Sequence, residues 1–113
     1  MQAQYRFSGP AAKGNVMQTY VILANFTQKG LNEIKDTGKR VDAFKTRAKS
    51  HGATVKEFFW TQGAHDMVCI VEAPDDLSMS ALILSGSKLG TFSGQTLRAF
   101  TAAEMEKILE KVS

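Results

Sequence analysis

The sequence has few of the residues that carry chemistry in small proteins, and each shortage excludes a class of site. It has one cysteine, Cys69, so no disulfide can form within the chain, and a reducing, cytoplasmic setting is expected. The two histidines, His51 and His65, do not combine with that cysteine at metal-ligand spacing, so no metal site is expected. No Gly-rich phosphate loop is present, and no Ser-x-Gly elbow of the Gly-x-Ser-x-Gly kind suggests a hydrolase. The sequence therefore predicts no cofactor.

Long apolar runs and clustered charge are also lacking. No apolar run approaches the roughly 20 residues that span a bilayer, so a soluble protein without membrane contact is expected. The net charge is +3, but Arg6 and Lys13 lie in an N-terminal segment without acidic residues, and the rest of the chain is close to neutral. Nucleic-acid-binding domains gather Lys and Arg on one face, and their β-α-β version carries a basic, aromatic block on the third strand. Residues 67–72 contain no such block, so no nucleic-acid partner is expected.

What the chain does have is enough apolar residues for one folded domain. It has 113 residues, of which 43% are hydrophobic. Residues 1–16 show neither helical nor strand periodicity and contain Gly9-Pro10 and Gly14-Asn15, so they are predicted to form a flexible N-terminal extension. The folded domain is expected to occupy residues 17–113, and Met17 is a candidate for the natural start.

Hydrophobic periodicity divides the domain into strands and helices. Four segments rich in β-branched and aromatic residues are predicted to be strands: 17–26, 57–62, 67–72 and 92–100. Helical spacing of apolar residues is found in three others: 27–51 with a break at 36–38, 77–89, and 101–112. The two middle strands are joined by the turn at residues 63–66, which makes them a hairpin.

This order predicts an α+β fold, a ferredoxin-like βαββαβ antiparallel sheet with a C-terminal helix. The first and third strands are the most apolar and are expected to be neighbours at the centre. Right-handed crossovers place both connecting helices on one face of the sheet. Tyr20 and Ile22 alternate with Val21 and Leu23, so the opposite face is apolar as well. A second copy is its simplest cover, which predicts a homo-oligomer, a dimer or higher, of the dimeric α/β barrel type.

Several blocks of the sequence resemble the GYD-domain family. The resemblance begins at Met17–Phe26 and includes Phe59-Trp60-Thr61, Gly63-Ala64-His65-Asp66 and Thr96-Leu97-Arg98-Ala99-Phe100-Thr101. It covers residues 17–109 and implies a dimeric α/β barrel in bacterial or archaeal proteins. The family has no established activity, so the resemblance brings no assigned catalytic residues. His65 stands where the family's signature has tyrosine, which puts any mechanism that needs a phenol in doubt.

His65 and Asp66 are the candidate catalytic residues. Imidazole titrates near neutrality, so His65 could accept and donate a proton beside a carboxylate. However, adjacent residues of a strand point in opposite directions, and Asp66 could instead bind backbone amides of the turn. Both an acid–base pair and a structural turn therefore remain open.

Four further residues are candidate ligand-binding positions, each with a structural alternative. Asn25 ends an apolar strand, where it would either make a turn hydrogen bond or point into a pocket. Trp60 would be a core residue or a stacking surface. Arg98 would bind an anionic ligand or pair with a carboxylate of the protein, for which Glu72 is a candidate. Arg40, in a charged run at a helix start, would be solvated or would hold an anion.

Two functions follow from these alternatives, and the sequence does not decide whether the protein is an enzyme. The first is a small-molecule-binding or cofactor-independent enzymatic barrel, with a pocket between sheet and helices near His65 and Trp60. The second is a non-catalytic assembly module, whose sheet face builds an oligomer and whose edge or tail recruits a partner.

Overall fold

A computed structural model describes residues 16–113, so all but the last residue of the predicted N-terminal extension lie outside the described range. The described chain contains a four-stranded antiparallel sheet with the order β3-β4-β2-β5. Its strands are β2 (Gln18–Phe26), β3 (Thr54–Trp60), β4 (Met67–Ala73) and β5 (Phe92–Ala99). The prediction that the first and third strands are central neighbours is confirmed, because β2 pairs with β4.

Helices fill the connections at positions close to those predicted. They are α1 (Gln28–Asn32), the 3-10 helix η1 (Ile34–Asp36), α2 (Thr37–Ser50), α3 (Asp76–Ser87) and α4 (Ala102–Glu110). The Thr27 hydroxyl caps α1 by accepting from Gly30 N, and Asp75 caps α3 by accepting from Ser78 N. Thr101 and Glu104 form the predicted capping box at the start of α4. Asp36 occupies the N-cap position of α2 but makes no side-chain capping bond there.

A β-bulge in β3 changes which side chains face the core. The pairing of β3 with β4 shifts between Val55 and Glu57, so Lys56 is the extra residue. Val55 lies opposite Val71 and Phe58 opposite Cys69, which puts both on the same face although they are three positions apart. Without the bulge, strict alternation would send them to opposite faces. The strand also begins at Thr54, three residues before the predicted start at residue 57.

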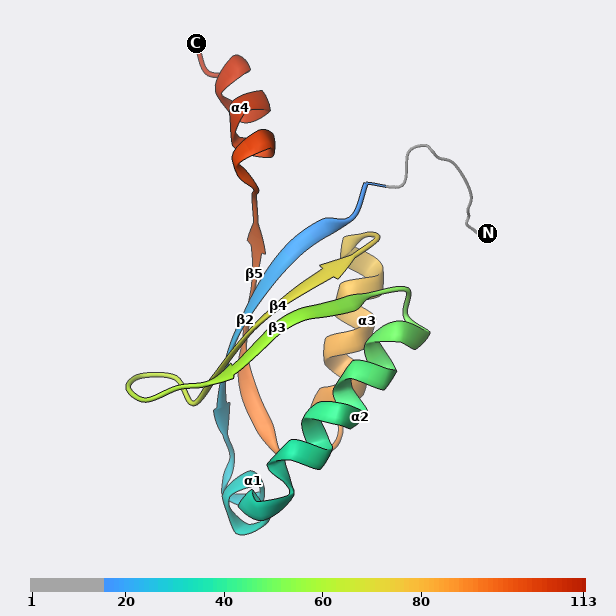
Figure 1. Cartoon of the computed structure of the whole chain (residues 1–113), viewed down its shortest axis with the longest axis vertical. Coiled ribbons are helices and arrows are strands. Elements are labelled where there is room, and N and C mark those ends of the chain that lie inside the picture. Colours follow the sequence, from blue (N-terminus) through green and yellow to red (C-terminus); the bar gives the residue numbers. More distant parts are fainter. Residues whose placement is uncertain (1–15) are drawn as a thin grey trace.

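One face of the sheet, here called the covered face, packs against α2 and α3. Figure 1 shows both helices on the same side of the sheet, as the crossover rule predicts. The core contains the alternate sheet residues Tyr20, Ile22, Ala24, Met67, Cys69 and Val71 together with Phe44 and Ala48 of α2 and Met79 and Leu82 of α3. Of the apolar positions predicted for these helices, Val41, Phe44, Ala48, Met79 and Leu82 are buried.

The opposite face of the sheet, here called the open face, has no covering element among residues 16–113. Register places Val21 beside Ile70 and Leu97, and Leu23 beside Val68. Phe59 lies opposite Val68 at the β3 edge. Leu97 is 42% exposed and Phe59 53% exposed. The open face is therefore apolar along its centre and uncovered within one chain.

The helix α4 continues beyond the end of β5 and away from the sheet (Figure 1). None of its residues is buried, and its apolar stripe includes Met105, 45% exposed, and Leu109, 55% exposed. A second difference from the sequence prediction is at Leu89. That residue was expected in the buried stripe of the helix at 77–89, but α3 ends at Ser87 and Leu89 is largely exposed.

Candidate functional site

The loop between β3 and β4 carries His65 and Asp66, and it is tied to the end of β2. The Asp66 carboxylate accepts from Phe26 N at 3.0 Å, while the Asn25 side-chain oxygen accepts from Asp66 N at 2.9 Å. These reciprocal bonds use the polar atoms of Asn25 and Asp66 in holding the loop. In the described structure the side chains of Asn25 and Asp66 therefore make hydrogen bonds to backbone amides, which is the structural role considered for each of them.

His65 lies in the same loop without contacting the Asp66 carboxylate through a hydrogen bond. Its backbone carbonyl accepts from the Thr61 hydroxyl at 2.6 Å. Its side chain is half-buried, and Nδ1 has no hydrogen-bond partner among residues 16–113. Because the Asp66 oxygen Oδ2 serves the Phe26 amide, the described geometry does not join these two residues as an acid–base pair.

Trp60 and Arg40 both brace the start of α2. Trp60 Nε1 donates to the Thr37 hydroxyl at 3.0 Å, which fastens the end of β3 to the first residue of the helix. The Arg40 guanidinium donates to two backbone carbonyls, Glu33 O at 2.7 Å and Gly30 O at 3.3 Å. Such bonds satisfy carbonyls that the short helix α1 leaves without partners. Both polar groups are therefore engaged within the protein.

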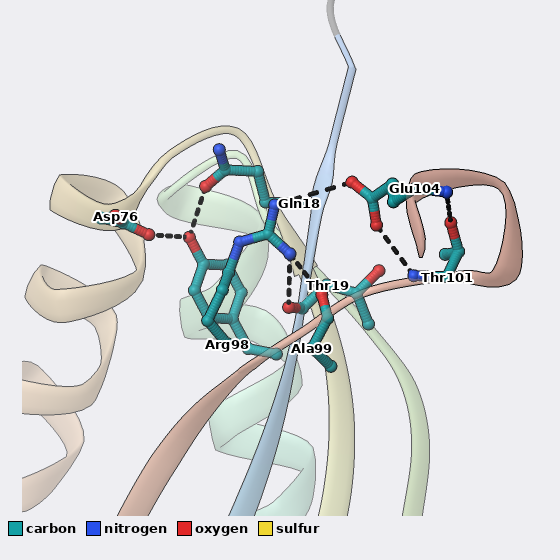
Figure 2. A network of polar contacts seen from close by, with 8 residues as sticks. Gln18, Thr19, Asp76, Arg98, Ala99, Thr101 and Glu104 are labelled. Atoms are coloured by element: carbon teal, nitrogen blue, oxygen red, sulfur yellow. Dashed lines mark hydrogen bonds and ion pairs between the residues drawn. The ribbon is translucent and has the colours of Figure 1, made fainter. Parts of the chain in front are cut away.

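At the other end of the sheet, Arg98 is the centre of a polar network (Figure 2). Its guanidinium lies 3.6 Å from the Glu104 carboxylate and donates to Thr19 O and Ala99 O. It also lies over the ring of Phe100, 4.6 Å from the centroid. Arg98 therefore pairs with a carboxylate of the protein. The suggested partner Glu72 was wrong, because its carboxylate lies 4.0 Å from Lys56 Nζ instead.

Tyr20 lies beside this network, with its ring centroid 5.7 Å from the central carbon of the Arg98 guanidinium. Tyr20 Oη donates to Asp76 Oδ1 at 2.5 Å, a bond between the central strand and the first residue of α3 (Figure 2). Burial first, and then the hydrogen bond to and the charge of Asp76, raise the pKa of Tyr20 to about 12, and the positive charge of Arg98 opposes this rise. The phenol therefore keeps its proton at neutral pH. An open groove beside it has Tyr20, Asp76, Ser80, Leu84, Thr96 and Arg98 among its lining residues.

A separate cavity lies between the covered face of the sheet and the helices α2 and α3. Its volume is about 110 Å³. Its walls are almost wholly apolar, and the sheet residues Ile22, Ala24, Phe26, Phe58, Met67 and Cys69 form its floor. The helices and the segment before β5 border it with Val41, Phe44, Ile83, Gly86, Leu89, Thr91 and Phe92, and α2 adds Arg40, Ala43 and Arg47. This is a partly open apolar space with two arginines among its lining residues.

Of the candidate residues from the sequence, the cavity brings in Arg40 alone. The linings of the cavity and of the groove do not include His65, Asp66, Asn25 or Trp60, and Arg98 lines only the groove. Burial raises the pKa of the Cys69 thiol to about 12, so this cavity residue stays protonated and is not a nucleophile at neutral pH. Within residues 16–113 no cluster of three potential metal ligands is present.

Sequence reasoning missed Arg47 and Gly86 as cavity residues, although one signal was available. Positions 40, 44 and 47 follow helical spacing, so the two arginines flank Phe44 beside the buried stripe of α2. Treating all basic residues of α2 as solvated hides the position of Arg47 beside the buried stripe. At Gly86 an added Cβ would lie 3.4 Å from the Phe92 ring and 3.7 Å from Arg47 Nη1, so glycine allows close packing there.

Comparisons with known proteins agree with the fold and identify the family. No curated protein is significantly similar in sequence. Among solved structures, the crystal structure of MtbAldR is similar with a TM-score of 0.61 at 14% sequence identity, over 84% of this chain. The chain spans 59% of the length of that protein, and at this identity the likeness shows a shared fold. None of the helices in residues 16–113 is long and apolar enough to cross a membrane. The sequence model described as the GYD domain matches residues 20–109, so the chain belongs to the GYD domain family.

Proposed function

We propose that this GYD domain is a small-molecule-binding domain that works as a homo-oligomeric α/β barrel. The cavity between the covered face and helices α2 and α3 carries the proposal, because it is an apolar, partly open space of about 110 Å³ beside the core. Cores are normally packed without voids larger than a water molecule. Pockets for small ligands, by contrast, have apolar walls and few polar groups.

The lining favours binding over proton-transfer catalysis. Its side chains include no histidine or carboxylate, and the Cys69 thiol is held protonated by burial. General acid–base catalysis needs a group whose pKa lies near the working pH. The pocket expected near His65 and Trp60 is accordingly proposed here at a different place, on the α2 and α3 side of the same sheet.

The open face supports the oligomeric part of the proposal. Val21, Leu23, Val68 and Ile70 form an apolar strip that no element of the described chain covers. A contiguous apolar surface on a soluble domain marks an interface. Packing this face on the same face of a second copy gives an isologous dimer and leaves one cavity in each subunit.

Titration with benzene tests the cavity. Benzene is expected to shift the NMR signals of Ile22, Val41 and Ile83 methyl groups, since an apolar cavity of about 150 Å³ in another protein binds it. Gly86→Leu should fill the space and abolish the shifts, whereas Gly86→Ala, whose methyl group makes only ordinary contacts, should retain them. Unchanged methyl signals in the wild-type protein at saturating benzene would contradict the proposal.

A second function, assembly without a ligand, is favoured by α4. The residues Met105, Ile108 and Leu109 of this helix and Val112 just after it form an apolar stripe at helical spacing, and none of the helix residues is buried by the rest of residues 16–113. If assembly is the function, the double variant Met105→Glu/Leu109→Glu should dissociate the oligomer in sedimentation velocity. Glu106→Lys on the charged side of α4 is the control and should not. A dimer that persists in the double variant would exclude α4 from the interface.

A further inference from the structure

The two arginines in the cavity lining differ in what their guanidinium groups do. Arg40 donates from both terminal nitrogens to backbone carbonyls, Glu33 O and Gly30 O, so its donors are occupied. The Arg47 guanidinium makes no hydrogen bond or ion pair with any of residues 16–113, although the residue is half-buried. Within residues 16–113 the fully buried polar atoms without a partner do not include those of Arg47, so its guanidinium is reached by solvent and its donors are available to a ligand.

Arg47 also sits at the place where the cavity is bounded by both helices. Its residue is on α2, and its Nη1 lies near Gly86 of α3, 3.7 Å from where a Cβ would be. Because Gly86 has no side chain, the approach from α3 to this guanidinium is unobstructed by that residue. The Arg47 guanidinium therefore lies at the edge of the cavity, next to the position in α3 where Gly86 has no side chain.

The remaining lining contains nothing that would balance a positive charge on a ligand. None of its side chains is an aspartate or glutamate, and Thr91 supplies the one neutral hydroxyl. The cavity thus combines apolar walls with one available cation and no anion. A bound zwitterion would leave its ammonium group without a charged partner.

We infer that the ligand of this cavity is a small apolar monocarboxylate, with its hydrocarbon body under the covered face and its carboxylate on Arg47. This inference deepens the proposed function and depends on it. Arginine suits the role because its planar fork donates two parallel bonds to a carboxylate. The volume of about 110 Å³ fits a hydrocarbon body of about five carbon atoms.

Three probes with the same hydrocarbon chain test the inference by calorimetry at neutral pH. They are hexanoate, 1-hexanol and 2-aminohexanoate, which differ only in the head group. Hexanoate should bind at least about tenfold more tightly than 1-hexanol, since a hydrogen bond to a charged group exceeds a neutral one. The added ammonium of 2-aminohexanoate should weaken binding relative to hexanoate.

The variant Arg47→Gln should remove the preference for hexanoate while leaving 1-hexanol binding in place. Lys45→Gln is the matched control, because it removes one positive charge from an exposed position of the same helix. Equal affinities for hexanoate and 1-hexanol in the wild type would contradict the inference that the ligand is a carboxylate. That result would not contradict the proposed small-molecule binding. Tighter binding of 2-aminohexanoate than of hexanoate would also overturn the inference. If none of the three probes binds, the proposed function itself fails.

Discussion

The two faces of the sheet are almost equally apolar in sequence, but within residues 16–113 helices cover only one of them. On β2, Ile22 is 5% exposed under α2 and α3, whereas its neighbour Leu23 lies on the open face and keeps part of its surface accessible. The strand therefore contributes apolar side chains in both directions, although one chain supplies helices for only one of them. An exposed face of this kind has little reason to be apolar in a monomer, because polar residues there cost nothing to expose.

The contrast extends to the helices. Helices α2 and α3 each bury an apolar stripe on the covered face, Val41, Phe44 and Ala48 in α2 and Met79 and Leu82 in α3, but α4 keeps its stripe exposed beyond the end of the sheet. The covered face is complete within one chain, apart from its cavity. The open face and α4 are the surfaces that another molecule would complete. Variants on the two kinds of surface should therefore differ in how their effects depend on protein concentration.

The largest effect is expected on the covered face. Ile22→Ala should reduce the free energy of unfolding by about 2–5 kcal/mol, because it leaves a cavity in a packed core. Urea unfolding should show this loss at every protein concentration. Leu23→Ala is the matched control, and its cost should rise with concentration because the proposed dimer would bury this side chain further. If both variants lost the same free energy of unfolding at every protein concentration, the two faces would not differ in the way proposed.

A charge on the open face should act on association. Ile70→Lys places an ammonium group at the centre of the apolar strip, where a second sheet would have to desolvate it. We expect association to weaken by at least about tenfold, or about 1.4 kcal/mol. Analytical ultracentrifugation gives the measurement, and Ser50→Lys on the exposed side of α2 is the control. A variant that still dimerises as tightly as the wild type would refute the use of this face.

The Tyr20 hydroxyl gives a smaller effect on the covered side. Tyr20→Phe removes the hydrogen bond to Asp76 and should cost about 0.5–1.5 kcal/mol at neutral pH. The folded pKa of Tyr20 is raised to about 12, above its usual value near 10, so the fold favours the neutral phenol. This contribution is fully present below pH 10 and is lost as the pH rises toward 12. The stability of Tyr20→Phe should fall less steeply over that window, as measured by urea unfolding.

The smallest effect concerns the attachment of α4. The hydrogen bond from Thr101 N lowers the pKa of Glu104, and the positive charge of Arg98 lowers it further. The contribution of this carboxylate is present above the ordinary glutamate pKa of about 4.3 and is lost as the pH falls through the lowered value. Acidification should therefore fray α4, visible as lost helical circular dichroism, and Glu104→Gln should reduce the change. Glu106→Gln should lose as much helical circular dichroism on acidification as the wild type. If Glu106→Gln reduced this loss more than Glu104→Gln does, the loss would not arise from the capping box.

Much of the architecture could be predicted because local patterns and the tertiary structure agree. The caps at Thr27, Asp75 and Thr101 and the apolar spacing of α2 specify helices that the core also requires. The start of β3 was missed because the bulge at Lys56 breaks the alternation on which the prediction depends. Pattern reasoning assumes a period of two, and one inserted residue reverses every later side chain.

The candidate site was less predictable, for a different reason. Asn25, Trp60 and Asp66 have side chains suited to binding ligands, but the same atoms satisfy backbone and side-chain partners that are distant in sequence. Whether a polar group is free depends on those partners, and residue type does not reveal them. Arg47 illustrates the converse, because helical spacing places it beside the buried stripe of α2 but only the tertiary packing shows that it lines a cavity.

The position of the one cysteine determines how the molecule can be labelled. Cys69 is 3% exposed and its thiol stays protonated, so thiol-directed dyes and cross-linkers should react with it slowly in the folded state. A cysteine introduced at Lys45, which is exposed on α2 and lies on neither the open face nor α4, would then be the one fast-reacting thiol in each chain. Fluorescence transfer between two such labelled preparations, once mixed, would report how quickly subunits exchange.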